Sequence, residues 1–459
     1  MQQSLLWVVM AGGWAFWLAG ICVGGESAAG RAIRHSDVVL TVKDPGGQAG
    51  AVGAPVSVPV ERLSLGGRLG GQLRLVELDA AGQGVGDPIA VQLDAPGVAA
   101  EQVVSQGTLW WLLPPGKAET RRYKLLAADE GQGQATQGQG LALPPAAASS
   151  VPAGTPSAAA RAAAKGGAVM RVVPAGREDW FLLCEGDRPI LRYNHGAVPA
   201  PPGIDPKYTR GDYIHPLFGL EGELLTDDYP KDHPHHRGVS WSWPVTRWKD
   251  QVRDIWAVVG VWSRPVAVRS KSEGPVFAAL SVGNVWKWGD EVPLVRETVV
   301  IRAFRQTAAG RFVDIEVSLE GLEEGVAIGG RPHAGYGGFG LRAAPTQEQK
   351  ITLHRDPAAR EPRRSWIDYS GRFQGAGRPS GLAIFEHPSN PGYPSELLQY
   401  PQLNYVMPAF PGQTEVPLPR GRTLVLRHRL WIHRGEGEEA LGAVWATYAN
   451  PPQVTVQER

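Results

Sequence analysis

The sequence predicts an all-β protein, with a small N-terminal β-sandwich and a large antiparallel β-sandwich. Apolar and polar residues alternate in several segments, which is the period of a strand with one buried face. Glycine and proline are abundant, at 58 and 39 residues, and mark many turns. A clear helical period occurs only near residues 438–448. Because 459 residues exceed one ordinary core, two domains are expected.

The first 29 residues are expected to direct export. Residues 5–23 are almost wholly apolar, and Ser27, Ala28 and Ala29 follow as a small-x-small cleavage site. Cleavage there predicts a periplasmic or extracellular location. A retained N-terminal membrane anchor is the alternative, because about 19 apolar residues can span a bilayer. The sequence offers no other contact with a membrane.

Composition divides the remainder into three regions. Residues 35–129 contain short strand-like runs between Gly- and Pro-rich turns, which predicts a small accessory β-sandwich. Residues 130–167 are nearly all Gly, Gln, Ala, Ser and Pro, which predicts a flexible linker. Residues 168–453 carry the clearest strands and are assigned to the large sandwich. Strand alternation is strongest at Val313, Ile315, Val317 and Leu319, and returns at Leu424, Leu426, Leu430 and Ile432.

Charge and cysteine content exclude some classes of partner. The formal charge of +1 and the lack of a long basic run argue against nucleic acid. After signal cleavage Cys184 is the single remaining cysteine, so an intrachain disulfide is excluded. Cys184 follows an apolar run and is interpreted as a buried structural thiol. Neutral molecules are therefore the expected ligands.

The strongest functional pattern is a histidine-rich segment at residues 232–238, Asp-His-Pro-His-His-Arg-Gly. Pro234 and Gly238 within it, and Pro230 just before it, favour a loop. Imidazoles change charge near neutral pH and suit proton transfer. Nearby Lys231, Trp241 and Trp243 are expected to complete a ligand site, with indole rings as walls. The alternative is a hydrogen-bonded loop without chemistry.

A divalent metal is a second interpretation of the same segment. His233 and His235 are two residues apart, so an extended backbone would point both rings to one side and His236 to the other. A catalytic zinc or iron site needs a third ligand, for which His215, His333 or a carboxylate are candidates.

Three further segments add candidate side chains. Residues 212–217 contain His215, which is equally compatible with a buried structural histidine. Residues 331–342 are rich in glycine and offer His333 and Arg342, with tight packing at a sandwich corner as the alternative. Residues 385–391 offer Glu386, His387 and Asn390, or they only cap a turn. His428 shares the apolar side of its strand and is assigned to the core.

Several of these segments resemble the signature segments of a known family. They are residues 193–195, 213–217, 225–238, 337–340, 366–371 and 387–390. On them the chain resembles the PmoA-like family of exported bacterial proteins of unknown function. The family name suggests a methane oxygenase subunit, but that subunit spans the bilayer several times, and its activity is not transferred. The resemblance implies a β-sandwich in the style of galactose mutarotase and other carbohydrate-processing enzymes, by analogy of fold.

These observations predict a carbohydrate-active enzyme that uses acid–base chemistry on a sugar or modified sugar, as an epimerase, lyase or hydrolase. His235 or His236 would be the acid or base, and Glu386 or Asp232 its partner. The remaining candidates would contact substrate: His215, Lys231, Arg237, Trp241, Trp243, His333, Arg342, His387 and Asn390. Two alternatives stay open, a metal-dependent oxygenase or hydrolase and a non-catalytic glycan-binding protein. All three functions require the histidine-rich segment and the three further segments to lie close together in space.

Overall fold

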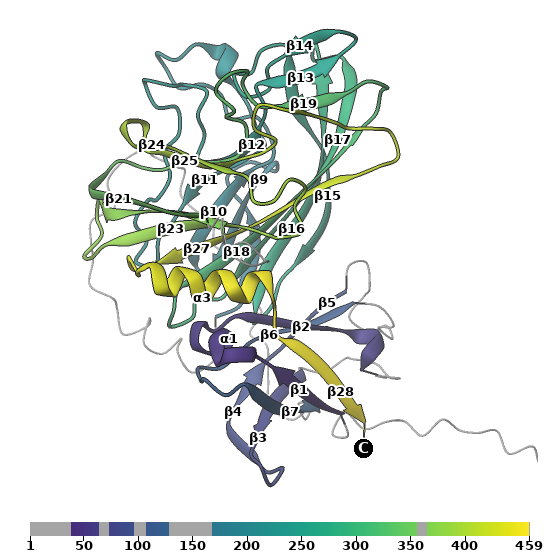
Figure 1. Ribbon diagram of the computed structural model, residues 1–459, viewed down its shortest axis with the longest axis vertical. Coiled ribbons are helices and arrows are strands. Elements are labelled where there is room, and N and C mark those ends of the chain that lie inside the picture. The colour runs from purple at the N-terminus through teal and green to yellow at the C-terminus, as the bar shows by residue number, and fades with distance from the viewer. Residues whose placement is uncertain (1–37, 64–72, 96–106, 128–167, 356–364, 459) are drawn as a thin grey trace, which may run out of the picture.

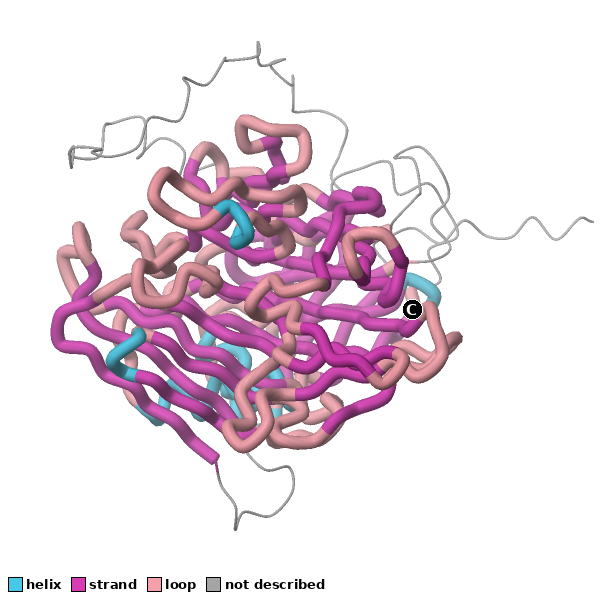
Figure 2. Tube along the Cα trace, turned by 90° about the horizontal axis from the view of Figure 1, so that it is seen from above, coloured by secondary structure: helices cyan, strands magenta, loops and turns pink. Residues whose placement is uncertain are grey.

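The computed structural model describes residues 38–63, 73–95, 107–127, 168–355 and 365–458. Within these ranges the prediction of an all-β sandwich architecture is confirmed, because the strands form five sheets of antiparallel pairs (Figures 1 and 2). The predicted signal peptide or anchor, residues 1–29, and the predicted linker, residues 130–167, lie outside the described residues.

Two eight-stranded sheets build the large sandwich. The first runs in the order β24 (Glu396–Tyr400), β25 (Tyr405–Ala409), β20 (Gly338–Arg342), β12 (Val239–Ser242), β11 (Tyr213–Leu217), β10 (Arg188–Asn194), β9 (Trp180–Glu185) and β8 (Met170–Pro174). The second runs in the order β15 (Val261–Ser272), β16 (Phe277–Trp288), β17 (Val292–Phe304), β18 (Arg311–Gly321), β27 (Leu424–His433), β23 (Ser380–Glu386), β22 (Ser365–Phe373) and β21 (Thr346–Arg355).

The alternation seen in the sequence decides which strand face meets the core. Along β18, Val313, Ile315 and Val317 are buried and join the core shared by the two sheets, while the residues between them are partly exposed. His428 of β27 is also buried, with its ring stacked on Phe339 at a centroid distance of 4.1 Å. The assignment of His428 to the core is confirmed.

A four-stranded sheet lies at the end of the large sandwich that is away from the small one (Figure 1). Its order is β14 (Gln251–Arg253), β13 (Val245–Trp248), β19 (Ala327–Gly329) and β26 (Glu415–Pro417). The segment between β14 and β15, and the loop between β19 and β20, leave this sheet toward the histidine-rich loop. Short 3-10 helices lie at η4 (Pro206–Tyr208) and η5 (Pro401–Leu403).

The small sandwich combines a five-stranded and a three-stranded sheet. The larger runs in the order β28 (Gln453–Glu458), β1 (Val38–Lys43), β7 (Thr120–Ala127), β3 (Leu73–Leu78) and β4 (Gly84–Ala90), and the smaller in the order β2 (Pro55–Pro59), β6 (Thr108–Leu112) and β5 (Gln92–Asp94). Helix α1 (Gln48–Val52) and 3-10 helices η2 (Pro45–Gly47) and η3 (Val60–Arg62) complete this part.

The two sandwiches are joined by a common core and by the last described strand. Helix α3 (Glu438–Ala449), where the sequence predicted a helix, lies between them (Figure 1). Its Leu441 and Trp445 pack in one apolar cluster with Trp111 of the small sandwich and Phe277 of the large one. After α3 the chain returns to the small sandwich, where β28 pairs with β1. The small sandwich is therefore completed by residues from both ends of the described chain.

Cys184 is buried in β9, as expected for a structural thiol, and burial raises its pKa to about 11. Among the helices in the described part of the chain, none has both the length and the apolar character needed to cross a bilayer.

Candidate functional site

The histidine-rich segment is a compact loop. Asp228 and Arg237 close it as an isolated antiparallel bridge, and the His236 N–H donates to the carbonyl of His233 at 2.8 Å. The rings of His233 and His236 stack at a centroid distance of 4.7 Å, and the ring of His235 lies 4.7 Å from that of His236. The expectation that His236 points away from the other two is wrong, because the turn folds it back onto His233.

The three histidines line a cavity of about 350 Å³. Its wall is formed by the loop itself, the segment after β14, the loop before β20, and the region from β24 through β25. The lining residues are His233, His235, His236, Trp256, Ala257, Arg331, Tyr336, Tyr400, Leu403, Tyr405 and Met407. A largely aromatic wall with a few convergent polar groups is typical of small-molecule sites.

Aromatic rings surround His236. The ring centroid of Tyr405 lies 4.7 Å from that of His236, and the centroid of Trp256 lies 5.8 Å from it. Trp256 in turn contacts Tyr336 at 5.4 Å. Tyr405 of β25 occupies this place because Gly340 of the neighbouring strand β20 has no side chain. A Cβ atom at Gly340 would lie 1.9 Å from the Tyr405 hydroxyl.

Arg237 holds the loop together from the inside. Its side chain is fully buried, and its guanidinium lies over the Tyr229 ring, 3.4 Å from the centroid. It donates to the carbonyls of Pro234 at 2.6 Å and Tyr208 at 2.5 Å, and pairs with the Asp228 carboxylate at 3.4 Å. The predicted contact between Arg237 and substrate is therefore corrected: its donors serve the chain's own carbonyls, and it is not part of the cavity wall.

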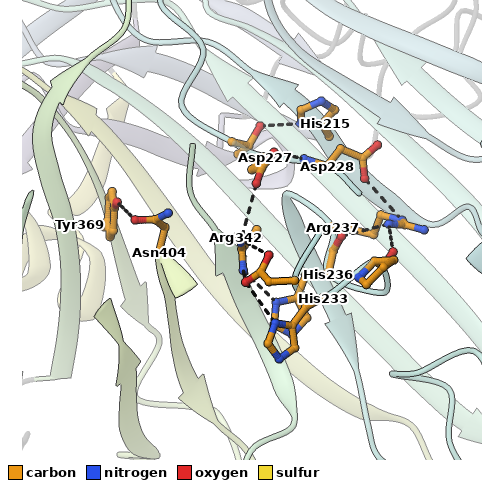
Figure 3. A network of polar contacts seen from close by, with 12 residues as sticks. His215, Asp227, Asp228, His233, His236, Arg237, Arg342, Tyr369 and Asn404 are labelled. Atoms are coloured by element: carbon orange, nitrogen blue, oxygen red, sulfur yellow. Dashed lines mark hydrogen bonds and ion pairs between the residues drawn. The ribbon is translucent and has the colours of Figure 1, made fainter. Parts of the chain in front are cut away.

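Arg342, at the end of β20, connects the loop to the sheet (Figure 3). Its two Nη atoms donate to the oxygens of Asp232 at 3.2 and 3.0 Å, and its Nε lies 3.5 Å from Asp227. Asp232 also lies 3.1 Å from His233 Nδ1. Because an ionised carboxylate only accepts hydrogen bonds, Nδ1 carries the proton. Arg342 thus positions a carboxylate–imidazole pair instead of making the predicted substrate contact.

Burial keeps two of the imidazoles neutral. Burial is the largest cause that lowers the pKa of His235 to about 4, and electrostatic repulsion from His233 and nearby arginines is a smaller cause in the same direction. Burial is the largest cause that lowers the pKa of His236 to about 2, and the electrostatic effects of His235 and His233 are smaller causes in the same direction. Desolvation raises the pKa of Asp232, but hydrogen bonds from Arg342 and His233 outweigh it and lower that pKa to about 2. Near neutral pH the cavity therefore presents His235 and His236 as neutral imidazoles, and an ionised Asp232 lies behind the third ring, that of His233.

The donor atoms do not fit the predicted divalent metal. The rings of His233 and His236 are nearly parallel, at 18°, so their nitrogens do not aim at one centre as tetrahedral ligation requires. His233 Nδ1 is engaged by Asp232, and an Nη atom of Arg342, which carries positive charge, lies 3.5 Å from His236 Nδ1. Within the described ranges, no group of three or more His, Cys, Asp and Glu side chains is arranged to hold a metal ion.

Trp241 and Trp243 belong to the core. Trp241 is buried in β12 and Trp243 directly after that strand. Trp241 Nε1 donates to Glu297 at 2.8 Å, and Trp243 Nε1 donates to the Phe410 carbonyl at 2.8 Å. The expectation that they wall the ligand site is wrong, because both indoles are enclosed in the core and neither lines the cavity.

Glu386, His387 and Asn390 do not converge with the histidines. Glu386 is buried at the end of β23 and accepts hydrogen bonds from two buried serines. His387 lines a different cavity, of about 470 Å³, beside the small sandwich. Asn390 exchanges two hydrogen bonds with the backbone of Arg427. The segment is a turn fixed by hydrogen bonds, which was the alternative interpretation.

His215, Lys231 and His333 also lie outside the cavity wall. His215 Nδ1 contacts the Thr226 hydroxyl at 3.0 Å, and burial, with Arg192 and Arg237 as smaller causes, lowers its pKa to about 3. Lys231 and His333 are exposed to solvent, and His333 has a φ of 65° in its tight loop. The predicted substrate contacts of these three residues stay predictions.

Sequence reasoning missed most of the aromatic wall. Arg331 and Tyr336 were within the glycine-rich segment, but only His333 and Arg342 were chosen there. Trp256 and Tyr405 lie in segments without histidines, so the search for imidazole clusters did not find them. One usable signal was Gly340, since a glycine inside a strand indicates close approach of another group.

Comparison with known families now adds one finding. A model of a family of unknown function, DUF6807, matches residues 182–446, which is more than half of the chain. The chain belongs to this family. No curated protein matches the chain. The DUF6807 region begins in β9, ends in α3 and contains every residue of the cavity wall, while the small sandwich lies outside it. The match does not bear on the PmoA-like resemblance, which stays a prediction.

Proposed function

We propose that the chain is an exported carbohydrate-active enzyme that moves a proton on a sugar bound in the histidine-lined cavity. One observation carries this proposal: three adjacent imidazoles, one backed by a carboxylate, line a small aromatic cavity. Proton transfer needs an acid or base within reach of the ligand, and a sugar needs rings against which its C–H faces can pack. The fold supports a carbohydrate site only by analogy.

His233 is the best candidate for the base. Asp232 holds the proton on Nδ1 at 3.1 Å, which leaves Nε2 as the acceptor in the neutral ring. The carboxylate would also stabilise the imidazolium that forms when Nε2 takes a proton. Arg342 fixes Asp232 through two hydrogen bonds, so the pair is held in place before a ligand binds. The sequence prediction was different: it gave His235 or His236 as the acid or base and Glu386 or Asp232 as its partner.

His235 and His236 would bind and orient hydroxyl groups. Their pKa values of about 4 and about 2 keep them neutral, and a neutral imidazole both donates and accepts. The Tyr405 phenol is held in its protonated form, since burial raises its pKa, and it would act as a donor. The cavity wall contains no carboxylate, so hydrolysis by a pair of carboxylates is not favoured. Epimerisation or elimination fits the side chains better.

The test uses the full chain in deuterated buffer with a panel of neutral and oxidised sugars, followed by proton NMR. Anomer interconversion, deuterium uptake at carbon or a new product is expected with at least one sugar. His233→Gln should abolish the reaction while binding persists. His354→Gln is the matched control, because His354 stacks on Trp366, 4.2 Å between centroids, and is not part of the cavity wall. Saturable sugar binding without any of these changes would instead establish a glycan-binding protein.

A further inference from the structure

Arg331 is built into the cavity wall with part of its guanidinium unused. Its backbone N–H donates to the Tyr336 carbonyl at 2.8 Å, and its own carbonyl accepts from Gly335 at 2.7 Å. In the side chain, Nε donates to the Tyr336 hydroxyl at 2.9 Å and Nη2 to Asp254 at 3.0 Å. Within the described residues, Nη1 has no partner. The loop therefore fixes a cation at the wall and leaves donors for a ligand.

The charge around the cavity favours an anion. Three arginines act on His235 by their charge, namely Arg210, Arg237 and Arg331. Arg210 is buried and donates to the Trp256 carbonyl at 3.4 Å. Asp232, Asp228 and Asp254 each pair with an arginine, namely Arg342, Arg237 and Arg331. Among the described residues that line the cavity, Arg331 is the permanently charged side chain and none is a carboxylate, so a negatively charged ligand would meet a fixed cation on the wall.

We propose that the ligand is an acidic sugar, a monosaccharide or disaccharide whose carboxylate is bound by Arg331 while neutral imidazoles contact its hydroxyl groups. This inference rests on the proposed function and names its substrate class. The planar fork of an arginine matches a carboxylate better than a lysine ammonium does. A cavity of about 350 Å³ lies near the lower end of small-ligand sites, which suits one or two sugar rings.

Binding of four probes to the full chain is measured by NMR titration: glucuronate, galacturonate, glucose and galactose. Each uronate is expected to bind about tenfold or more tightly than its neutral counterpart, as a charge-assisted hydrogen bond allows. Arg331→Gln should remove this difference, so that the ratio of uronate affinity to neutral-sugar affinity falls to about one. Arg331→Lys, which keeps the charge but loses the fork, should restore part of it. Arg247→Gln is the control, because Arg247 makes a similar pair with Glu415 at 2.6 Å outside the wall.

The outcomes separate this inference from the proposed function. Equal binding of uronates and neutral sugars, unaffected by Arg331→Gln, would overturn the acidic-sugar class and leave the sugar site intact. Preference for glucose 6-phosphate over glucuronate would overturn the carboxylate in favour of a phosphate ester. Failure of all these sugars to bind would overturn both proposals. Folding of each variant is checked by its melting temperature, so that loss of binding is assigned only to folded protein.

Discussion

At the scale of single residues, burial sets the chemistry of the histidine-rich loop. An isolated imidazole titrates near pH 6.5, so it would be half charged in a weakly acidic medium. Removal from water and neighbouring positive charge lower the pKa of His235 to about 4. His236, which is more deeply enclosed, has a pKa of about 2. The cavity therefore keeps neutral donors and acceptors over a wide range of pH.

The pH dependence of binding should reflect these values. His235 becomes charged only as the pH falls through about 4, and the charged ring loses its acceptor. Affinity for a neutral sugar that depends on His235 should stay constant from pH 7 to about pH 5 and then fall. His235→Gln should remove that fall, as measured by titration across pH. A decline centred on the ordinary histidine value would contradict the proposed role.

The buried guanidinium of Arg237 should be one of the most sensitive positions for stability. Arg237→Met removes donors from three carbonyls and takes the paired guanidinium away from Asp228. A destabilisation of about 3 to 5 kcal/mol is expected, because a buried charge loses its counterpart. Urea unfolding measures it, with Arg264→Met as control, since the Arg264–Asp290 pair lies nearer the surface and should contribute less than about 1 kcal/mol. Equal effects of the two changes would refute the buried-anchor role.

The sequence identified the loop but not the role of each residue in it. Three histidines, one proline and one glycine within seven positions were enough to predict a loop with polar chemistry. The turn that folds His236 back depends on Arg237 reaching the carbonyl of Tyr208, 29 residues earlier, and no local pattern encodes that contact. Trp241 and Trp243 were misplaced for a related reason. A strand that is buried on both faces carries no alternation to show which side faces a ligand.

At the scale of elements, two adjacent strands of one sheet, β20 and β25, support the cavity wall. Gly340 of β20 has no side chain, which leaves room for the phenol of Tyr405 from β25. Arg342 at the end of β20 fixes the histidine-rich loop through Asp232. The alternating strands β18 and β27 and the helix α3 could be predicted because their periodicity lies within one segment. The pairing of β12 with β20, and of β20 with β25, joins segments distant in sequence, and periodicity says nothing about it.

Gly340→Ala should therefore displace Tyr405 from the cavity wall without replacing any polar side chain. The new methyl group would overlap the Tyr405 hydroxyl, at 1.9 Å, and force the phenol out of place. Overpacking of this kind costs about 1 to 3 kcal/mol, and ligand affinity should fall with it. Thermal unfolding and NMR titration test both effects. Gly377→Ala is the control, because its nearest neighbour would lie 3.5 Å away. Unchanged affinity in Gly340→Ala would show that Tyr405 is not needed.

At the scale of the whole molecule, the two sandwiches share one apolar core, which predicts that they unfold as one unit. Residues of the small sandwich, of α3 and of the large sandwich share one apolar cluster. The sequence suggested two domains because composition changes abruptly around residues 130–167. It could not reveal that the last strand returns to the first sheet, since strand pairing at such distance leaves no periodic trace.

A pair of neighbouring substitutions in β28 tests this coupling. Val454 is buried in the shared cluster, and Thr455 points to solvent. Val454→Asp should destabilise the protein by about 3 kcal/mol or more, because a charge enters the core. Thr455→Asp should stay within about 0.5 kcal/mol of the wild type. Calorimetry should show one transition that moves as a whole in Val454→Asp. Two transitions, with only one displaced, would contradict a shared core.

The pairing of β1 with β28 also sets an order of events during synthesis. Thr41 and Thr455 lie on adjacent strands although they are 414 residues apart. The first strand leaves the ribosome long before its neighbour has been translated. Until then one edge of the small sheet is open to any other strand, including that of a second nascent chain. The N-terminal part of this protein must therefore wait for the last strand before its first sheet can close, and it needs protection from misassembly throughout that interval.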